Sequence, residues 1–307
     1  FNNEELSKHA LTLKSTYDAI NIRNHILQNF EDIINEPEKR DEGLYNIVIV
    51  GAGPTGVELS GAFAEIKKNI LPKDFNKINF EDLKIILVEG GDNVLNSMSE
   101  KSHKESEMYL KKLGVEVRKN TSVVSYDGDV IEMGSGEKIK TKTLIWAAGV
   151  IAHTIEGIPE EYIVRGNRIK VNRINKLEAT DNVFVIGDMS IMETENYPNG
   201  HPQLANVAIN QGKNLAKNLK RIEEGKETVD YSYKDLGTMA TVGFKKAVVD
   251  LPFIHFKGIF AWLVWMFLHL MLILSVKNKL IIFINWAWAY ITKNTSLRII
   301  LKRDDTD

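Results

Sequence analysis

Hydrophobic and polar residues are arranged along the chain in patterns that predict alternating helices and buried strands. From Ser15 to Glu36, apolar residues recur at helical spacing, and Ser15 with Asp18 forms a predicted capping box. Apolar runs at 45–50 and 83–88, and a return run at 143–150, are typical of buried strands. A small-residue helix at 57–68 and a polar helix at 96–113 lie among them, which favours the α/β class.

Shorter strands are predicted in the middle of the chain. The segments 115–117, 121–124 and 130–133 are separated by turn residues, and this spacing indicates an antiparallel meander. A further apolar strand is predicted at 182–186, and a helix is expected to start near Gln203. The middle of the chain is therefore expected to be rich in β structure.

Composition narrows the class of protein. The chain has 307 residues, 44% hydrophobic and 26% charged, which is enough for two compact units and an appendage. Its net charge of -2 provides no basic field, so nucleic acid is not an expected partner. There is no cysteine, which excludes a disulfide framework, a cysteine zinc site and a catalytic thiolate within these residues. We predict no metal site.

A glycine motif follows the first apolar strand and leads directly into a helix. Gly51 allows a tight turn, Gly53 lets the backbone approach a pyrophosphate, and Gly56 allows close packing of the helix. Pro54 and Thr55 lie inside the same turn and are included in the predicted site. The helix N-terminus would face the phosphates, so a dinucleotide is the expected ligand. The alternative is an ordinary glycine-rich turn.

An acidic residue completes this motif. Glu89 ends the strand at 83–88, where a carboxylate is placed to bind the adenosine ribose hydroxyls. A carboxylate at this position would repel the 2′-phosphate of NADP, so we expect NADH to be preferred.

A second group of candidate residues lies further along the chain. Ala148 and Gly149 are small residues at a strand end, where a ligand could lie against the backbone. Gly187 and Asp188 end another predicted strand, and the carboxylate could bind sugar hydroxyls or cap a turn. The start of the following helix has a small-residue face suited to a flat ring system, although helix packing is an alternative. Its first residues are also predicted to bind cofactor: Gln203, Leu204 and Ala205.

The last segment differs in composition. Residues 258–276 form a nineteen-residue apolar run, and a second apolar stretch at 280–291 is rich in aromatic residues. We favour two helices lying on a bilayer surface over a spanning helix, because the second stretch is too short to return across a bilayer. A buried dimer interface is a further alternative. The segment ends in cations suited to a lipid headgroup region: Lys293, Arg298, Lys302 and Arg303.

Taken together, these motifs resemble those of the type II NADH dehydrogenases, non-proton-pumping NADH:quinone oxidoreductases. Residues 51–61 resemble the family's NADH motif, 146–150 its strand return, and 183–188 its second FAD motif. Residues 236–243 and the tail at 262–292 resemble the segment leading into its membrane anchor and the anchor itself. The resemblance implies a glutathione-reductase-like flavoprotein with two dinucleotide-binding domains.

The resemblance also implies an activity. Hydride would pass from NADH to non-covalent FAD, and electrons would then reach a membrane quinone. Glu58 matches a family glutamate close to the nicotinamide and flavin, and its alternative role is to complement the helix dipole. Asn206 and Asn210 stand where family quinone sites carry glutamines, and Gln211 is a candidate substitute.

The family pattern predicts the organisation of the chain. Residues 1–43 would be a helix and linker from the FAD side, 44–145 the NADH domain, 146–235 the returning FAD-domain segment and 236–307 the anchor region. The family's earlier FAD motif is not found, so we expect a C-terminal fragment that binds NADH better than FAD. Peripheral association with the cytoplasmic face of a bacterial inner membrane is expected, and a homodimer is compatible with the sequence.

Two other functions are compatible with the same motifs. One is another cysteine-free, FAD-dependent pyridine-nucleotide oxidoreductase. The other is a membrane-tethered module that binds NADH without turnover.

Overall fold

The computed structural model describes residues 4–36, 41–153, 155–273 and 275–292. It divides into two compact units, one containing residues up to 148 and from 236 onward, the other residues 149–235. The predicted cations from Lys293 onward lie outside the described residues.

The first unit begins with the predicted capped helix. Helix α2 spans Thr16–Asn35, and the capping box formed by Ser15 and Asp18 is present as predicted. The Ser15 hydroxyl accepts the Asp18 N–H at 3.2 Å, and the Asp18 carboxylate accepts the Ser15 N–H at 2.9 Å. Before it lie a short helix and a short strand: α1 (Glu4–His9) and β1 (Leu11–Thr12).

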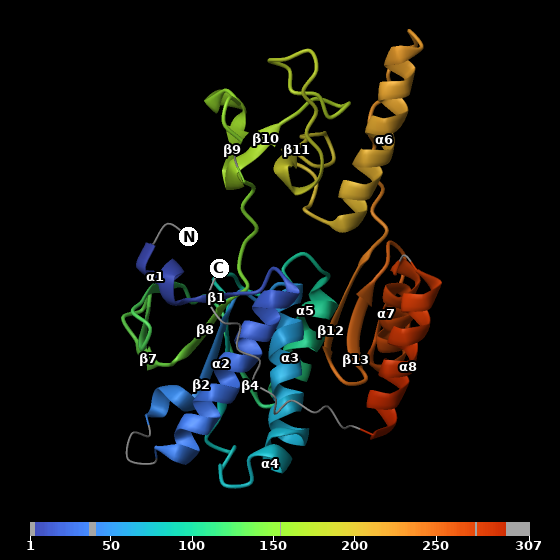
Figure 1. Ribbon diagram of the computed structural model, residues 1–307. Coiled ribbons are helices and arrows are strands. Elements are labelled where there is room, and N and C mark those ends of the chain that lie inside the picture. Colours follow the sequence, from blue (N-terminus) through green and yellow to red (C-terminus); the bar gives the residue numbers. More distant parts are fainter. Residues whose placement is uncertain (1–3, 37–40, 154, 274, 293–307) are drawn as a thin grey trace. The chain divides into compact units, whose positions relative to one another are not determined.

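A five-stranded parallel sheet forms the centre of this unit (Figure 1) and confirms the α/β prediction. The strand order is β1-β8-β2-β3-β4, so the chain runs outward from β2 and later returns on its other side as β8. The strands and their connecting helices are β2 (Asn46–Val50), α3 (Pro54–Asn69), α4 (Leu71–Asp74), β3 (Lys84–Val88), α5 (Glu100–Lys112), β4 (Val115–Arg118) and β8 (Thr143–Trp146), and a 3₁₀ turn, η2 (Glu42–Tyr45), precedes β2.

Strand β4 corrects one sequence prediction. We expected residues 115–117 to open the antiparallel meander, but β4 pairs in parallel with β3. Helix α5 connects the two strands, and parallel neighbours require such a crossover. The meander therefore contains three later strands: β5 (Val123–Tyr126), β6 (Val130–Met133) and β7 (Lys138–Lys140).

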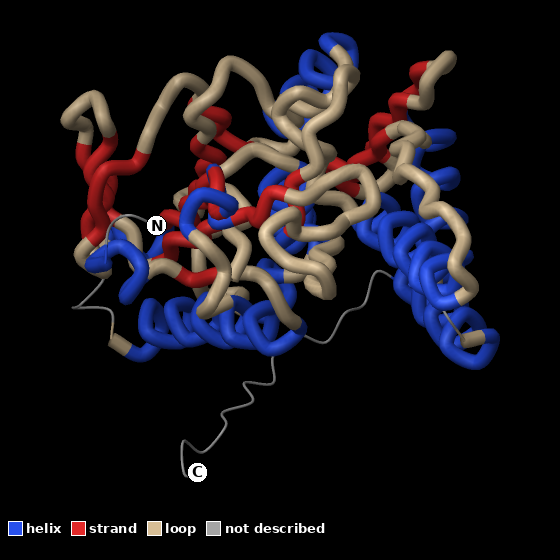
Figure 2. The backbone as a smooth tube through the Cα atoms, turned by 90° about the horizontal axis from the view of Figure 1, so that it is seen from above, coloured by secondary structure: helices blue, strands red, loops and turns tan. Residues whose placement is uncertain are grey.

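Alternating side chains of the central strands fill two separate cores. Ile47 and Ile49 of β2 pack with α2 and α3, whereas Val48 and Val50 face the meander and α1. All four are buried, because a parallel sheet covered on both faces exposes neither. The strand and helix layers are seen in Figure 2 as red and blue tubes.

The C-terminal part of the first unit is a small antiparallel sheet followed by two apolar helices. These elements are β12 (Thr238–Gly243), β13 (Lys246–Asp250), β14 (His255–Lys257), α7 (Gly258–Leu272) and α8 (Val276–Thr292). Several apolar side chains of α7 and α8 are exposed, among them Phe260, Phe267, Leu272 and Ile284. None of the described helices has both the length and the apolar character that crossing a bilayer requires.

The second unit has little regular structure outside one long helix. Its core is a small cluster around Ile169, Leu177 and Val185. The strand predicted at 182–186 is wrong, because only an isolated bridge between Lys176 and Phe184 forms there. Its elements are η3 (Glu160–Tyr162), β9 (Ile163–Val164), η4 (Arg165–Asn167), β10 (Arg168–Lys170), η5 (Gly187–Met189), β11 (Ser190–Ile191) and α6 (Ala205–Glu223).

Candidate functional site

The glycine turn lies at the carboxyl end of β2, beside β8. The chain crosses from β2 to β3 on one side and returns as β8 on the other, which is the switch point where α/β sheets bind ligands. Gly51 has φ +100°, and a Cβ there would lie 2.7 Å from the Cα of Ala148. A glycine is therefore required at residue 51, and Ala148 borders the turn.

The other two glycines of the motif differ in their surroundings. A Cβ on Gly56 would overlap the carbonyl oxygen of Gly51, so this glycine permits close packing of α3. A Cβ on Gly53 would meet no protein atom within 4 Å, which is the open space a pyrophosphate needs. Helix α3 begins at Pro54, and Gly53 is its N-cap residue. Among the described residues, no side chain accepts a hydrogen bond at this helix end. The N–H groups of this helix end are therefore directed at the open space.

Glu89 lies at the same sheet edge as the glycine turn. Its Oε2 accepts the Ala52 N–H at 2.7 Å, and its Oε1 accepts the Gly91 N–H at 2.8 Å. The carboxylate therefore ties the glycine turn to the end of β3. Both bonds orient the carboxylate at the end of β3, and its contact with a ribose stays a prediction.

Glu58 lies one turn into α3. Burial raises the pKa of its carboxyl group, while the N–H and hydroxyl of Thr241 and the charge of His269 lower it by less. The Thr241 N–H donates to Glu58 Oε1 at 3.2 Å. A half-buried acid with a raised pKa holds its proton to higher pH than an exposed glutamate does.

In the second unit, the Gly187–Asp188 turn lies against the start of α6. Gly187 has φ +69°, and a Cβ there would lie 3.4 Å from Ala208. The Gln203 side chain donates to the Asp188 carbonyl at 3.1 Å, and the Asp188 carboxylate is exposed. The structure thus brings these residues together with Leu204 and Ala205, both exposed, at one helix end. Gly149 lies in the same unit, with nothing within 4 Å of a Cβ placed there.

The three amides predicted for the quinone have different surroundings. Gln211 is buried, and its Oε1 accepts the Gly187 N–H at 2.7 Å and the Ser190 hydroxyl at 3.3 Å. Asn206 and Asn210 are partly exposed, one turn apart on α6. The Oδ1 of Asn206 is buried and accepts no hydrogen bond from the described residues.

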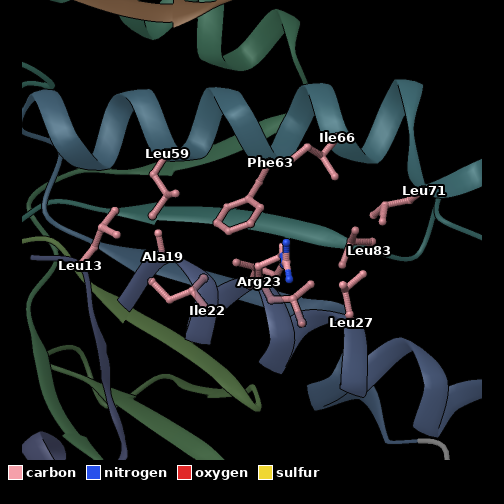
Figure 3. Close-up of a pocket in the computed structure, with 12 residues that line it drawn as sticks. Leu13, Ala19, Ile22, Arg23, Leu27, Leu59, Phe63, Ile66, Leu71 and Leu83 are labelled. Atoms are coloured by element: carbon pink, nitrogen blue, oxygen red, sulfur yellow. The ribbon is translucent and has the colours of Figure 1, made fainter. Parts of the chain in front are cut away.

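A cavity of about 260 Å³ lies elsewhere, between α2 and α3 (Figure 3). Its lining is apolar apart from Arg23, and it contains none of the predicted site residues. The described residues contain no group of three or more metal-binding side chains.

Two residues that shape the surroundings of Glu58 were not predicted as site residues. Thr241 reaches Glu58 from a strand 183 positions away, and Gly61 of α3 packs on the backbone of that strand. The small residues of α3 indicated close packing, but no local pattern identifies the strand that it packs against.

The fold and these motifs agree with comparison to known proteins. Residues 12–212 match the family of pyridine nucleotide-disulphide oxidoreductases, and the chain belongs to this family. Residues 236–295 match the NDH2 C-terminal domain, so the resemblance to type II NADH dehydrogenases drawn from the sequence is confirmed.

Curated relatives with similar sequences are named as members of the same family. The chain is 32% identical over 305 residues to the type II NADH:quinone oxidoreductase Ndh of Mycobacterium tuberculosis, covering 95% of this chain and 64% of that protein. It is 32% identical over 249 residues to the type II NADH:quinone oxidoreductase of Staphylococcus aureus, covering 79% of this chain and 60% of that protein. The chain therefore spans about three fifths of the length of these relatives.

A solved structure shares the fold. NDH2 of Plasmodium falciparum, solved in complex with NADH, superposes with a TM-score of 0.85 at 19% identity, covering 98% of this chain and 76% of that one.

Proposed function

We propose that this chain supplies the NADH site and part of the FAD and quinone sites of a non-proton-pumping NADH:quinone oxidoreductase. NADH would bind at the glycine turn, and a quinone from the membrane would be the final acceptor. A bound, non-covalent FAD would supply the chemistry that accepts hydride and releases electrons. The relatives named type II NADH:quinone oxidoreductases support this assignment.

The observation that carries the proposal is the geometry of the glycine turn. Three features lie together at the carboxyl end of the parallel sheet. They are open space at Gly53, a start of α3 without a side-chain cap, and the Glu89 carboxylate held by backbone hydrogen bonds. These are the three groups that a dinucleotide requires: space for the pyrophosphate, N–H donors and an acceptor for ribose hydroxyls. The negative charge of Glu89 favours NADH over NADPH.

The second unit fits part of an FAD site. Its turn at Gly187 leaves the Asp188 carboxylate exposed next to the first turn of α6. An exposed acid can accept sugar hydroxyls, and a helix start with small, exposed residues can lie against a flat ring. Asn206 and Asn210 follow on the same helix and are the accessible amides that could donate to a quinone oxygen.

Glu58 is proposed to exchange protons during turnover. Oxidation of NADH by a quinone consumes one proton from the medium, because NADH supplies a hydride and the quinol carries two hydrogens. The raised pKa of Glu58 places this carboxyl closer to neutral pH than an ordinary glutamate. It could therefore hold that proton.

We further propose that α7 and α8 attach the protein peripherally to a bilayer surface, on the cytoplasmic face of a bacterial inner membrane. The exposed apolar side chains of α7 support this attachment, since large exposed apolar patches mark membrane or protein contacts. A homodimer through the same surface is the alternative use of these side chains.

Membrane attachment can be tested by flotation with vesicles of phosphatidylglycerol and phosphatidylethanolamine. Phe267→Asp combined with Leu272→Asp should abolish co-flotation. Val124→Asp, at an exposed apolar position on β5, is the matched control and should leave it unchanged. Loss of dimerisation without loss of flotation would support the dimer interface instead.

The activity is tested with the longest polypeptide that the coding sequence supplies. Purified protein is mixed with NADH and a short-chain quinone, and NADH absorbance is followed. Quinone-dependent NADH oxidation, without oxidation of NADPH at the same rate, is expected. Saturable NADH binding without oxidation would instead indicate a nucleotide-binding module.

A further inference from the structure

Helix α3 rests directly on the backbone of strand β12. Gly61 is the residue at the contact, because a Cβ there would overlap the carbonyl oxygen of Val242. Both residues are buried, and β12 is the edge strand of the three-stranded C-terminal sheet. In Figure 1, α3, β12 and α7 lie in this order from left to right within the first unit. We call this contact of Gly61 with Val242 the α3–β12 joint.

Glu58 lies one turn before Gly61 on α3. The joint places it against Thr241, the residue before Val242 on β12. The Thr241 N–H donates to Glu58 Oε1 at 3.2 Å. Any side chain at residue 61 would push the helix away from the strand, and the hydrogen bond would lengthen beyond its useful range. The absence of a side chain at Gly61 is thus what allows the contact at Glu58.

Helix α7 adds a third group from the C-terminal region. It packs on the same sheet through the buried Ala261 and through Trp262. The ring centroids of Trp262 and Phe244 are 5.5 Å apart. His269 stacks on Trp265 with 3.9 Å between ring centroids, and its Nδ1–H donates to the Trp265 carbonyl at 2.8 Å. This hydrogen bond and the ring stacking hold the His269 side chain in one orientation on α7.

The charged and polar groups that act on Glu58 therefore come from β12 and α7, which follow it in the sequence by more than 180 residues. Thr241 of β12 and His269 of α7 are the two residues that lower its pKa against the effect of burial. The next charged pair along α3, Glu65 with Lys246 of β13, is 3.8 Å apart and two turns from Glu58.

We propose that Gly61 is a positioning residue, and that through the α3–β12 joint the C-terminal region controls the acid at the nucleotide site. A carboxyl group that serves hydride and proton chemistry would then respond to the part of the chain that carries the exposed apolar helices. The functional consequence rests on the proposed function above, but the joint itself is tested independently of it.

The first test follows the titration of the Glu58 carboxyl by ¹³C NMR on selectively labelled protein, with Glu58→Gln identifying the signal. Gly61→Ala should move the titration midpoint down, toward an ordinary glutamate, because the helix lifts and water reaches the carboxyl group. Ala62→Ser, on the exposed face of the same turn, is the matched control and should not move it.

A second variant keeps the proposal testable if Gly61→Ala fails to fold. His269→Leu keeps Glu58 buried but removes a charge that stabilises its ionised form, so the midpoint should move up. The two variants therefore shift the titration in opposite directions. An unchanged midpoint in His269→Leu, or in a folded Gly61→Ala protein, would overturn the proposal.

The functional consequence has its own readout. In the full-length protein, the pH optimum of kcat for NADH oxidation should follow the two titration shifts, while KM for NADH stays within about twofold. If the titration shifts occur but no quinone-dependent activity is found, the joint stands and the proposed function fails. If the protein is active but the pH profile of kcat does not follow the titration of Glu58 in either variant, the joint has only a structural role.

Discussion

The two glycine-acid motifs of the chain differ in what holds the acid. Both oxygens of Glu89 accept backbone N–H groups, one of them from inside the glycine turn. The carboxylate of Asp188 is exposed, and its turn is held instead by Gln211 of α6. The first site is oriented by the ends of a continuous parallel sheet, and the second by side-chain hydrogen bonds to a loop, from Gln211, Gln203 and Ser190.

This difference separates a self-contained site from a dependent one. The strands around Glu89 are buried on both faces, so their ends are rigid. The turn at Gly187 lies in a unit with a small core and short strands. We therefore expect the nucleotide site to be fully formed in this chain, and the Gly187–Asp188 site to depend on its supporting contacts.

The largest effect is expected at the glycines of the nucleotide motif. Gly56→Ala should abolish NADH binding and destabilise the fold by about 1–3 kcal/mol, because its Cβ overlaps the Gly51 carbonyl. Gly53→Ala should abolish binding but leave stability nearly unchanged, because its Cβ meets no protein atom. Calorimetric NADH titration and thermal unfolding separate the two. Equal destabilisation by both variants would contradict this account of the turn.

The dependence of the second site on Gln211 is the next largest effect. Gln211→Ala leaves the Gly187 N–H without its acceptor and should cost about 1–3 kcal/mol of local stability. Hydrogen exchange at residues 187–191 should accelerate accordingly. Asp188→Asn, which changes an exposed carboxylate, is the control and should leave exchange unaffected. If the two variants behave alike, Gln211 is not the support of this turn.

Nucleotide preference should respond more modestly to Glu89. Glu89→Gln removes the negative charge facing the ribose, so the ratio of NADPH to NADH dissociation constants should fall by about tenfold, or about 1.4 kcal/mol. Competitive binding with both nucleotides measures the ratio. A ratio equal to that of the unmodified chain would remove Glu89 from the ribose site.

The smallest effect is a pH dependence confined to the second unit. His201 is buried among Tyr197, Tyr231 and Tyr233, and burial, followed by the charges of Arg173 and Arg168, lowers its pKa.

On acidification the unfolded state therefore binds a proton at His201 before the folded state does. The free energy of unfolding should decline as pH falls below about 6.5. Protection factors of residues 168–201, corrected for the intrinsic pH dependence of amide exchange, should fall below this pH, and His201→Phe should remove the dependence. Protection factors that do not change with acid in the unmodified chain would show that His201 is protonated without loss of structure.

Local patterns predicted local structure well. The capping box at Ser15 and the strand, glycine turn and helix of the nucleotide motif all form as predicted, because each depends on neighbours within a few residues. Strand β4 was misplaced because its pairing with β3 is set by the crossover through α5. The apolar run at 182–186 forms only a bridge, since an apolar run does not reveal whether a partner strand is available.

The candidate sites show the same division. The sequence indicated the glycines and Glu89, since each follows a predicted strand end. It did not reveal that Glu89 bonds the Ala52 N–H, or that Thr241 and His269 act on Glu58. Those contacts join residues far apart in the chain, and only the folded arrangement brings them together.

The central claim is that the glycine turn and Glu89 form a preorganised NADH site, and an NMR titration of this chain with NADH tests it most directly. Amide shifts should be largest at residues 51–56 and 89–91 and should saturate at micromolar to millimolar NADH. No saturable change at these residues, or changes concentrated elsewhere, would contradict the account.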